Sequence, residues 1–259
     1  MGYLSAIGYA LVLWWVSTGV IIVLYRQPRW TYAATFGMLS VIAAGCATLM
    51  FLIRNDTSIT ATYLSFSAGT LVWGWNLASY YTGAISGPLT VIPAEPLTAR
   101  QRFRLAVRSG LYHELVSLGI VIIALWWCID APNTSGQLTI VLFYVMHQLS
   151  KLNIYFGARN FSGEWLPAHL RYVMVFFGPN RNHWFFGVTI SVALGITLWT
   201  IISALNAIDI AVQIRMTFLA LLSGAAVLEI FVLMIPPAYL HRSLAFLTHL
   251  SVAANTKPR

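Results

Sequence analysis

Long apolar runs alternate with short polar stretches along almost the whole chain. A helix needs roughly 20 residues to cross a hydrocarbon core about 30 Å thick, and the runs have that length. Because lipid offers no partner for backbone amides and carbonyls, each run is expected to form a helix. The sequence therefore predicts an all-α transmembrane bundle in a single domain, 1–259, with seven spans over residues 3–25, 32–53, 61–85, 105–129, 138–157, 184–205 and 211–235.

Two further stretches, outside these runs, also have helical patterns. Residues 162–177 begin with Ser162 and Glu164, which favour a helix start, and a Gly-Pro pair at 178–179 ends them. Residues 237–250 follow a pair of prolines and place leucines on one side and basic residues on the other. We expect both stretches to form interfacial helices on the cytoplasmic surface.

The composition is that of a membrane protein and leaves no room for a soluble catalytic domain. Hydrophobic residues make up 59% of the 259 residues and charged residues only 8%, whereas soluble domains carry about 25% charged residues. The two cysteines, Cys46 and Cys128, lie in different runs without paired spacing. Neither a disulfide framework nor a cysteine metal motif is indicated.

The formal net charge of +8 comes from an uneven distribution of the 15 Lys and Arg residues. Short cytoplasmic loops of membrane proteins are enriched in these residues. One set of alternate loops contains all of them except Arg54 and Arg215. This predicts an N-terminus outside the cytoplasm and a C-terminus inside it. The basic face is also expected to attract anionic lipid headgroups, so no nucleic-acid partner is needed to explain the charge.

Ionisable residues inside the expected spans are few, and each is a candidate functional residue because burying it in a membrane is costly. The fourth span carries His113 and Glu114, the fifth carries His147 and Lys151, and the seventh carries Glu229. The predicted orientation places them all in the cytoplasmic half of the bilayer. We expect one polar cluster shared by three helices.

His113 has two interpretations. Gly110 and Ser117 share its helix face, and such small residues would leave a slot in which the imidazole ligates a flat tetrapyrrole, bacteriochlorophyll or haem. A buried histidine in a membrane bundle more often only forms hydrogen bonds. Both interpretations remain open, with His113, Glu114 and His147 as the cofactor-binding candidates.

Glu114 and Glu229 also have two interpretations. Together with the two histidines they would supply a metal site or a proton relay, although no span has the Glu-x-x-His pair that is typical of carboxylate metal bundles. Alternatively, Glu114 forms an ion pair with Lys151 or Arg159 that neutralises both charges.

The third span carries a stripe of small and aromatic residues at helical spacing. Such stripes usually pack against neighbouring helices. The stripe consists of Ser65, Gly69, Trp73, Asn76 and Tyr80. We expect it to be a packing surface.

Several short motifs are spread along nearly the whole chain. They are Trp-Trp-Val-Ser-Thr-Gly at 14–19, Thr-Gly at 82–83, Ser-Gly-Pro at 86–88, Leu-Tyr-His-Glu-Leu at 111–115, Lys-Leu-Asn at 151–153, Phe-Gly-Ala-Arg-Asn at 156–160 and Leu-Pro-Ala-His-Leu-Arg-Tyr at 166–172. With these motifs the chain resembles the PuhE family of photosynthetic complex assembly proteins from phototrophic bacteria. The stretch 151–172 is the most specific part of the resemblance.

The resemblance implies a role in assembling the reaction centre and its light-harvesting complex, or in supplying bacteriochlorophyll to them. It implies a location in the bacterial cytoplasmic or intracytoplasmic membrane. The implied partners are reaction-centre and light-harvesting subunits or other assembly factors. The resemblance and the polar cluster together indicate eight residues with a structural or partner-binding role. These residues are Lys151, Asn153, Arg159, Asn160, Glu164, His169, Arg171 and Glu229.

Three functions from different classes are compatible with the sequence. A non-enzymatic assembly factor is favoured. The alternatives are a tetrapyrrole carrier and a metal-dependent membrane enzyme that acts on a lipid-soluble pigment precursor, quinone or carotenoid.

Overall fold

The computed structural model describes residues 2–89, 97–161, 166–178 and 183–235. Within these residues all regular structure is helical, which confirms the all-α prediction for this part of the chain. The helices are α1 (Gly2–Tyr25), the 3-10 turn η1 (Arg29–Thr31), α2 (Tyr32–Leu52), α3 (Ile59–Tyr81), α4 (Ala99–Ser109), α5 (Leu111–Trp127), α6 (Ser135–Phe156), the 3-10 helix η3 (Ala168–Phe176), α7 (Phe185–Asn206) and α8 (Ile210–Met234).

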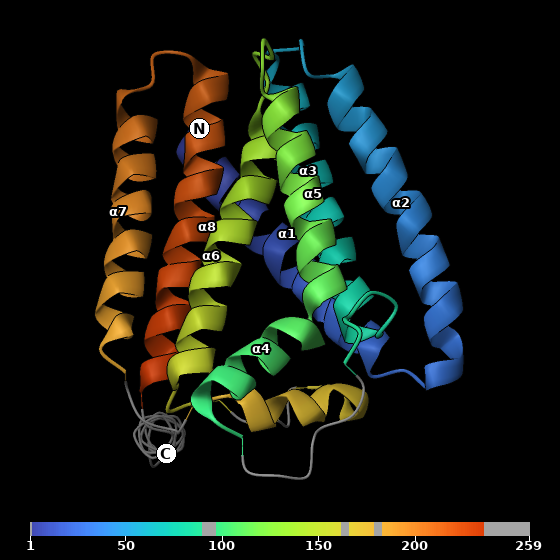
Figure 1. The fold of residues 1–259 in the computed structure, drawn as a ribbon. Helices are drawn as coiled ribbons and strands as arrows, with labels where there is room; N and C mark the ends of the chain where they lie inside the picture. The colour runs from blue at the N-terminus through green and yellow to red at the C-terminus, as the bar shows by residue number, and fades with distance from the viewer. Residues whose placement is uncertain (1, 90–96, 162–165, 179–182, 236–259) are drawn as a thin grey trace, which may run out of the picture.

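The long helices run side by side and form one bundle (Figure 1). α3 and α6 are its central helices. α3 contacts α1, α2, α5, α6 and α8, and α6 contacts α3, α5, α7 and α8. Each of the seven expected spans overlaps one long helix, although the ends of the helices differ from the expected bounds.

Not all seven helices have the length and apolarity of an independent membrane crossing. Four helical segments do, Tyr3–Tyr25, Arg29–Leu52, Phe185–Asn206 and Ile210–Met234, and the bent pair α4–α5 is a fifth if it counts as one span. The exceptions are the central helices α3 and α6, which bury Asn76 and Asn153. A helix enclosed by protein can carry more polar groups than one facing lipid, because the bundle supplies their hydrogen-bond partners.

The fourth expected span, 105–129, is not one continuous helix. The chain breaks at Gly110, and α4 and α5 meet at an angle of 61°. Thr98 and Gln101 form a reciprocal capping box at the beginning of α4, so this helix starts as a separate unit. The third span also ends before residue 85, because α3 stops at Tyr81 and Gly83 adopts a left-handed turn with φ of 76°.

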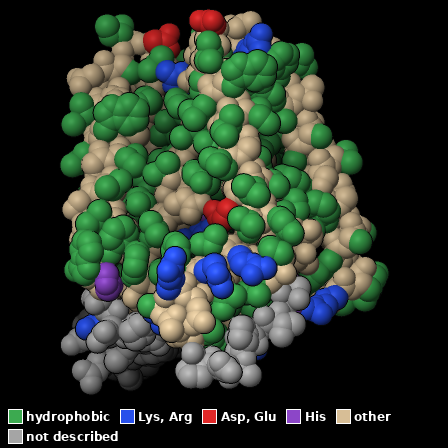
Figure 2. Space-filling view, in the orientation of Figure 1, with side chains coloured by type: hydrophobic (Ala, Val, Ile, Leu, Met, Phe, Trp, Pro, Cys, Tyr) green, Lys and Arg blue, Asp and Glu red, His purple; other side chains and the backbone are tan. Residues whose placement is uncertain are grey.

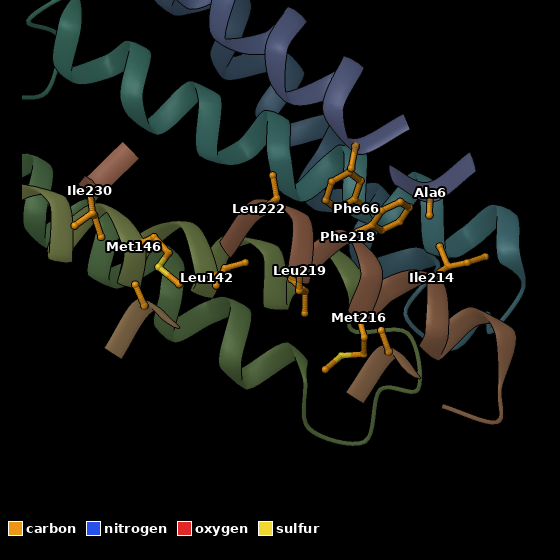
Figure 3. Close-up of a cluster of buried hydrophobic side chains, with 13 residues drawn as sticks. Ala6, Phe66, Leu142, Met146, Ile214, Met216, Phe218, Leu219, Leu222 and Ile230 are labelled. Carbon is orange, nitrogen blue, oxygen red and sulfur yellow. The ribbon is translucent and has the colours of Figure 1, made fainter. Parts of the chain in front are cut away.

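The largest hydrophobic core joins α8 to α1, α3, α6 and α7. The rings of Phe66 on α3 and Phe218 on α8 stack with their centroids 4.1 Å apart. Leu142, Leu219 and Ile230 extend this cluster along α6 and α8 (Figure 3). In a membrane these contacts stabilise the bundle through close packing, because lipid tails are as apolar as the side chains themselves.

The backbones of α3 and α6 touch at a pair of glycines. A Cβ on Gly69 would lie 2.3 Å from the carbonyl oxygen of Gly136, and a Cβ on Gly136 would lie 2.2 Å from the carbonyl oxygen of Ser65. The amide of Gly136 donates to Ser65 Oγ at 2.9 Å. Farther along α3, the ring of Trp73 stacks on Phe143. The stripe predicted along the third span is therefore a packing surface.

α4 and η3 lie across one end of the bundle, and we call these two helices the platform (Figure 1). Leu105 of α4 packs with Val173 and Phe176 of η3 in a small core of its own. Figure 2 shows a row of Lys and Arg side chains on the face next to the platform with an acidic side chain above them, and both acidic and basic side chains at the opposite end. The platform is therefore the basic end of the described bundle.

The first predicted interfacial helix differs from the expectation in type and length. Its described part is the 3-10 helix η3, whereas the sequence predicts a helix over 162–177. Pro167 fixes the backbone directly before η3 and contributes no amide hydrogen to an α-helix. Residues 162–165, which include Glu164, and the second predicted interfacial helix, 237–250, lie outside the described residues.

Candidate functional site: a polar cluster at the basic end

The ion pair between Glu114 and Lys151 is the centre of the polar cluster. Glu114 lies in the first turn of α5, where the helix dipole favours a carboxylate, and Lys151 lies near the end of α6. The two side chains form a salt bridge, and Gln148 Nε2 donates to the second carboxylate oxygen of Glu114 at 2.6 Å. Of the two partners expected for Glu114, the structure shows Lys151, while Arg159 is exposed. The pair links α5 to α6.

The ion pair is not fully enclosed. The side chains of Lys151 and Glu114 are 38% and 29% exposed, respectively. This is the single salt bridge among the residues that the structure describes. Two opposite charges that are partly buried between helices stabilise each other, and each would be costly without its partner.

His113 is buried beside the ion pair but faces other partners. It is 3% exposed, and the ring of Tyr80 lies 4.9 Å from its imidazole, measured between centroids. Ser117 donates to the carbonyl of His113 and exchanges hydrogen bonds with Asn76, the shorter at 2.9 Å. Tyr80 also lies 3.9 Å from a Cβ placed on Gly110, so it borders the slot that is expected beside His113.

His147 of α6 and Glu229 of α8 lie near the same end of the bundle, with neighbours of their own. His147 packs edge-on against Trp73 at 5.8 Å between ring centroids. Glu229 of α8 lies near Ser150 of α6. Among the described residues, no three His, Cys, Asp or Glu side chains come close enough to hold one metal ion. The metal shell considered from the sequence is therefore not assembled among the residues that the structure describes.

Two asparagines of the 151–172 region hold helix ends together. Asn153, which is 2% exposed, exchanges hydrogen bonds with Thr189 of α7 at 2.8 and 3.0 Å. The backbone amide of Asn160 donates a hydrogen bond to the carbonyl oxygen of Leu233 at 2.9 Å. Its side-chain amide donates a second one to the carbonyl oxygen of Val232 at 3.3 Å. Carbonyls in the last turn of a helix lack intrahelical partners. Asn160 therefore caps α8.

Replacing Asn153 with alanine is expected to lower the free energy of unfolding by about 1–2 kcal/mol, because the Thr189 hydroxyl loses its partner on the neighbouring helix. Thr189→Val should have a similar effect. The double variant should lose about 1 kcal/mol less than the sum of the single losses. Unfolding by SDS in mixed micelles measures all three. Strictly additive losses would show that the two side chains do not stabilise each other.

The remaining motif residues lie on or near the platform. Arg159 and Arg171 are exposed. His169 of η3 packs beside Gly83, where a Cβ would lie 3.1 Å from its Nε2. Burial, and then the positive charge of Arg29, lower the pKa of His169 from its ordinary 6.5. The contact with Gly83 joins η3 to the turn that follows α3.

Acidification is expected to weaken the packing of η3 through protonation of His169. Because its pKa is lower in the folded protein than in the unfolded chain, the unfolded chain binds more protons below about pH 6.5. Stability is then complete above this pH and decreases as the pH falls toward the folded pKa. Thermal unfolding in detergent between about pH 7 and about pH 5 should show a smaller decrease for His169→Gln than for the wild type. Identical decreases would exclude a contribution from His169.

The sequence analysis did not predict α4 as a separate helix, nor Asn160 as the residue that caps the end of α8. The first had a local signal: Thr98 and Gln101 have the spacing of a capping box, and Arg100, Arg104 and Arg108 follow at helical intervals. The second had none, because the carbonyls that Asn160 caps lie on α8, far away in sequence.

Over 234 residues the chain is 26% identical to an uncharacterized 30.4 kDa protein of Rhodobacter capsulatus, with 87% of this chain and 84% of the relative covered. The name of that protein places it in the 5′ region of puhA. No solved structure matches the chain. The model of the family DUF3623, described as a protein of unknown function, matches residues 1–242, and the chain therefore belongs to this family.

Proposed function

We propose that this chain is a membrane-embedded assembly factor for the bacterial reaction centre and light-harvesting complex, or for the supply of bacteriochlorophyll to it. The observation that carries the proposal is the similarity to the Rhodobacter capsulatus protein, which extends over 87% of the chain and whose name places it in the 5′ region of puhA. The resemblance of the 151–172 region to the PuhE family supports the same role.

The proposal includes seven membrane spans, α1, α2, α3, α5, α6, α7 and α8, with the N-terminus outside and the platform at the cytoplasmic surface. α3 has 23 residues and α6 has 22, enough at 1.5 Å per residue to cross a core of about 30 Å. Arg26 and Arg29 precede α2 at the platform end, where Tyr32 contacts His169 of η3. Basic residues on one side support a cytoplasmic location for this end.

The outer faces of α1 and α7 suit the docking of other membrane subunits. Large apolar side chains such as Trp15 and Trp199 are exposed there. At Gly8 and Gly19 of α1 and Gly195 of α7, an added Cβ would meet no atom within 4 Å. Small residues on a lipid-facing surface allow another helix to approach closely. In this proposal the Glu114–Lys151 pair braces the bundle, while the outer faces and the platform bind partners.

Co-purification tests the proposed function. The tagged full chain is expressed in a phototrophic bacterium during induction of its photosystem and purified in mild detergent. We expect reaction-centre or light-harvesting subunits, identified by mass spectrometry, to be enriched over a purification of an unrelated tagged polytopic protein at equal expression. Recovery of the chain without any of these subunits would contradict the proposal.

The absorption spectrum of the same preparation tests the tetrapyrrole-carrier alternative. Because Tyr80 covers the imidazole of His113, we expect any pigment absorbance to be the same in the wild type and in His113→Ala. A chromophore that is present in the wild type and lost in His113→Ala would instead support ligation by this histidine.

A further inference from the structure

We propose that α4 carries a binding site for the phosphate headgroups of anionic phospholipids. The inference rests on the membrane location in the proposed function and adds a specific element and a specific ligand chemistry. α4 is bent by 61° from α5 and lies across the end of the bundle (Figure 1). A helix in this position runs along the membrane surface if the long helices cross the membrane.

The exposed side of α4 has two adjacent strips of different chemistry. One strip consists of Arg100, Arg104 and Arg108, all exposed, at intervals of four residues or about 6 Å along the helix. The other consists of Phe103 and Val107, which are 54% and 44% exposed. An apolar strip beside a basic strip is the pattern of helices that lie at a membrane interface. The buried side is fixed to η3 through Leu105.

The three arginines have no partner of opposite charge in the part of the chain that the structure describes. The single salt bridge found there joins Lys151 to Glu114. Like charges four residues apart destabilise a helix, and the first turn of α4, which contains Arg100, has no acidic residue to interact with the helix dipole. An external anion that binds the strip would offset these costs.

A phospholipid headgroup fits this surface better than an acidic protein segment. The guanidinium group binds phosphate oxygens through two parallel hydrogen bonds. The acyl chains of the same lipids would contact Phe103 and Val107, whereas a soluble acidic peptide would leave these side chains exposed. Figure 2 shows basic side chains beside a hydrophobic surface at this end of the molecule.

Native mass spectrometry of the detergent-solubilised full chain measures the binding directly. The chain is titrated with phosphatidylglycerol and, separately, with phosphatidylcholine of the same acyl chains. The test variant combines Arg100→Gln, Arg104→Gln and Arg108→Gln. The matched control, which removes equal charge from exposed positions outside α4, combines Arg26→Gln, Arg29→Gln and Arg159→Gln.

We expect the wild type to prefer phosphatidylglycerol, and the test variant to bind it about tenfold more weakly or worse while its phosphatidylcholine binding is unchanged. The control variant should keep most of the wild-type affinity. Equal losses in both variants would overturn the proposal, because diffuse charge would then explain the binding. A wild type without headgroup preference would overturn it too, as would tighter binding of a soluble poly-glutamate peptide than of phosphatidylglycerol. If the triple variant does not fold, Arg104→Gln against Arg159→Gln gives the same comparison with a smaller expected loss, about threefold.

This experiment separates the inference from the proposed function. It uses the isolated chain without reaction-centre or light-harvesting subunits. Loss of the headgroup preference would leave the co-purification result intact, and a chain that binds phosphatidylglycerol through α4 but never co-purifies with those subunits would refute only the assembly role.

Discussion

Replacing Gly136 with alanine is expected to lower the free energy of unfolding by about 3 kcal/mol, because the new methyl group would overlap the backbone of α3. Its Cβ would lie 2.2 Å from the carbonyl oxygen of Ser65 and 2.9 Å from Met50 Cε. Gly69→Ala should have a similar effect, since its Cβ would meet the backbone of Gly136 at 2.3 Å. A backbone oxygen cannot rotate away as a flexible side chain can, so α3 and α6 would have to separate.

Alanine at two other helical glycines provides the control for this prediction. At Gly119 of α5 and Gly195 of α7, a Cβ would meet no atom within 4 Å. Alanine also has the higher helix propensity, so these variants should be neutral or more stable by up to about 1 kcal/mol. SDS-induced unfolding in mixed micelles compares all four variants. If Gly136→Ala is as stable as Gly195→Ala, the close contact of α3 with α6 is wrong.

Replacing Lys151 with methionine is expected to destabilise the protein by about 2–3 kcal/mol, because it leaves the carboxylate of Glu114 without its cation inside the bundle. Glu114→Gln should cost a similar amount by leaving Lys151 unpaired. Removing both charges at once should restore stability to within about 1 kcal/mol of the wild type, since no charge then remains to be neutralised.

Arg159→Met is the matched control for the ion-pair prediction. Arg159 is exposed, and no carboxylate among the described residues pairs with it, so the same change of residue type should have little effect there. Equal stability of Lys151→Met and Arg159→Met, or a double variant as unstable as Lys151→Met alone, would show that the ion pair does not stabilise the bundle.

Apolar run length predicted the long helices well, because a lipid solvent forces every long apolar run into the same conformation. It did not indicate the break at Gly110, which lies inside the expected range 105–129 and where the backbone turns. It also could not show that α3 and α6 are central. That arrangement depends on the contact of Gly69 with Gly136, which joins residues far apart in the sequence.

The polar cluster was only partly predictable. Depth in the membrane indicated that Glu114 and Lys151 share a level, and opposite charges at one level are expected to pair. The partners of the uncharged polar residues could not be predicted. Asn153 bonds to Thr189 and Asn160 caps α8, and both contacts depend on how α7 and α8 fold back against α6. Single-chain periodicity carries no information on such contacts.

Reporter fusions along the chain test the central claim, a seven-span bundle with its platform in the cytoplasm. Truncated chains are fused, after the turn that ends each hairpin, to alkaline phosphatase, which is active only outside the cytoplasm, or to a green fluorescent protein that folds only inside it. Fusions after Asp56, Asn133 and Asp209 should show phosphatase activity, and fusions after Gln27 and after the complete chain should fluoresce. Phosphatase activity after the complete chain, together with phosphatase activity after Asp56, would contradict the span number. Phosphatase activity after Gln27, together with fluorescence after Asp56, would contradict the cytoplasmic position of the platform.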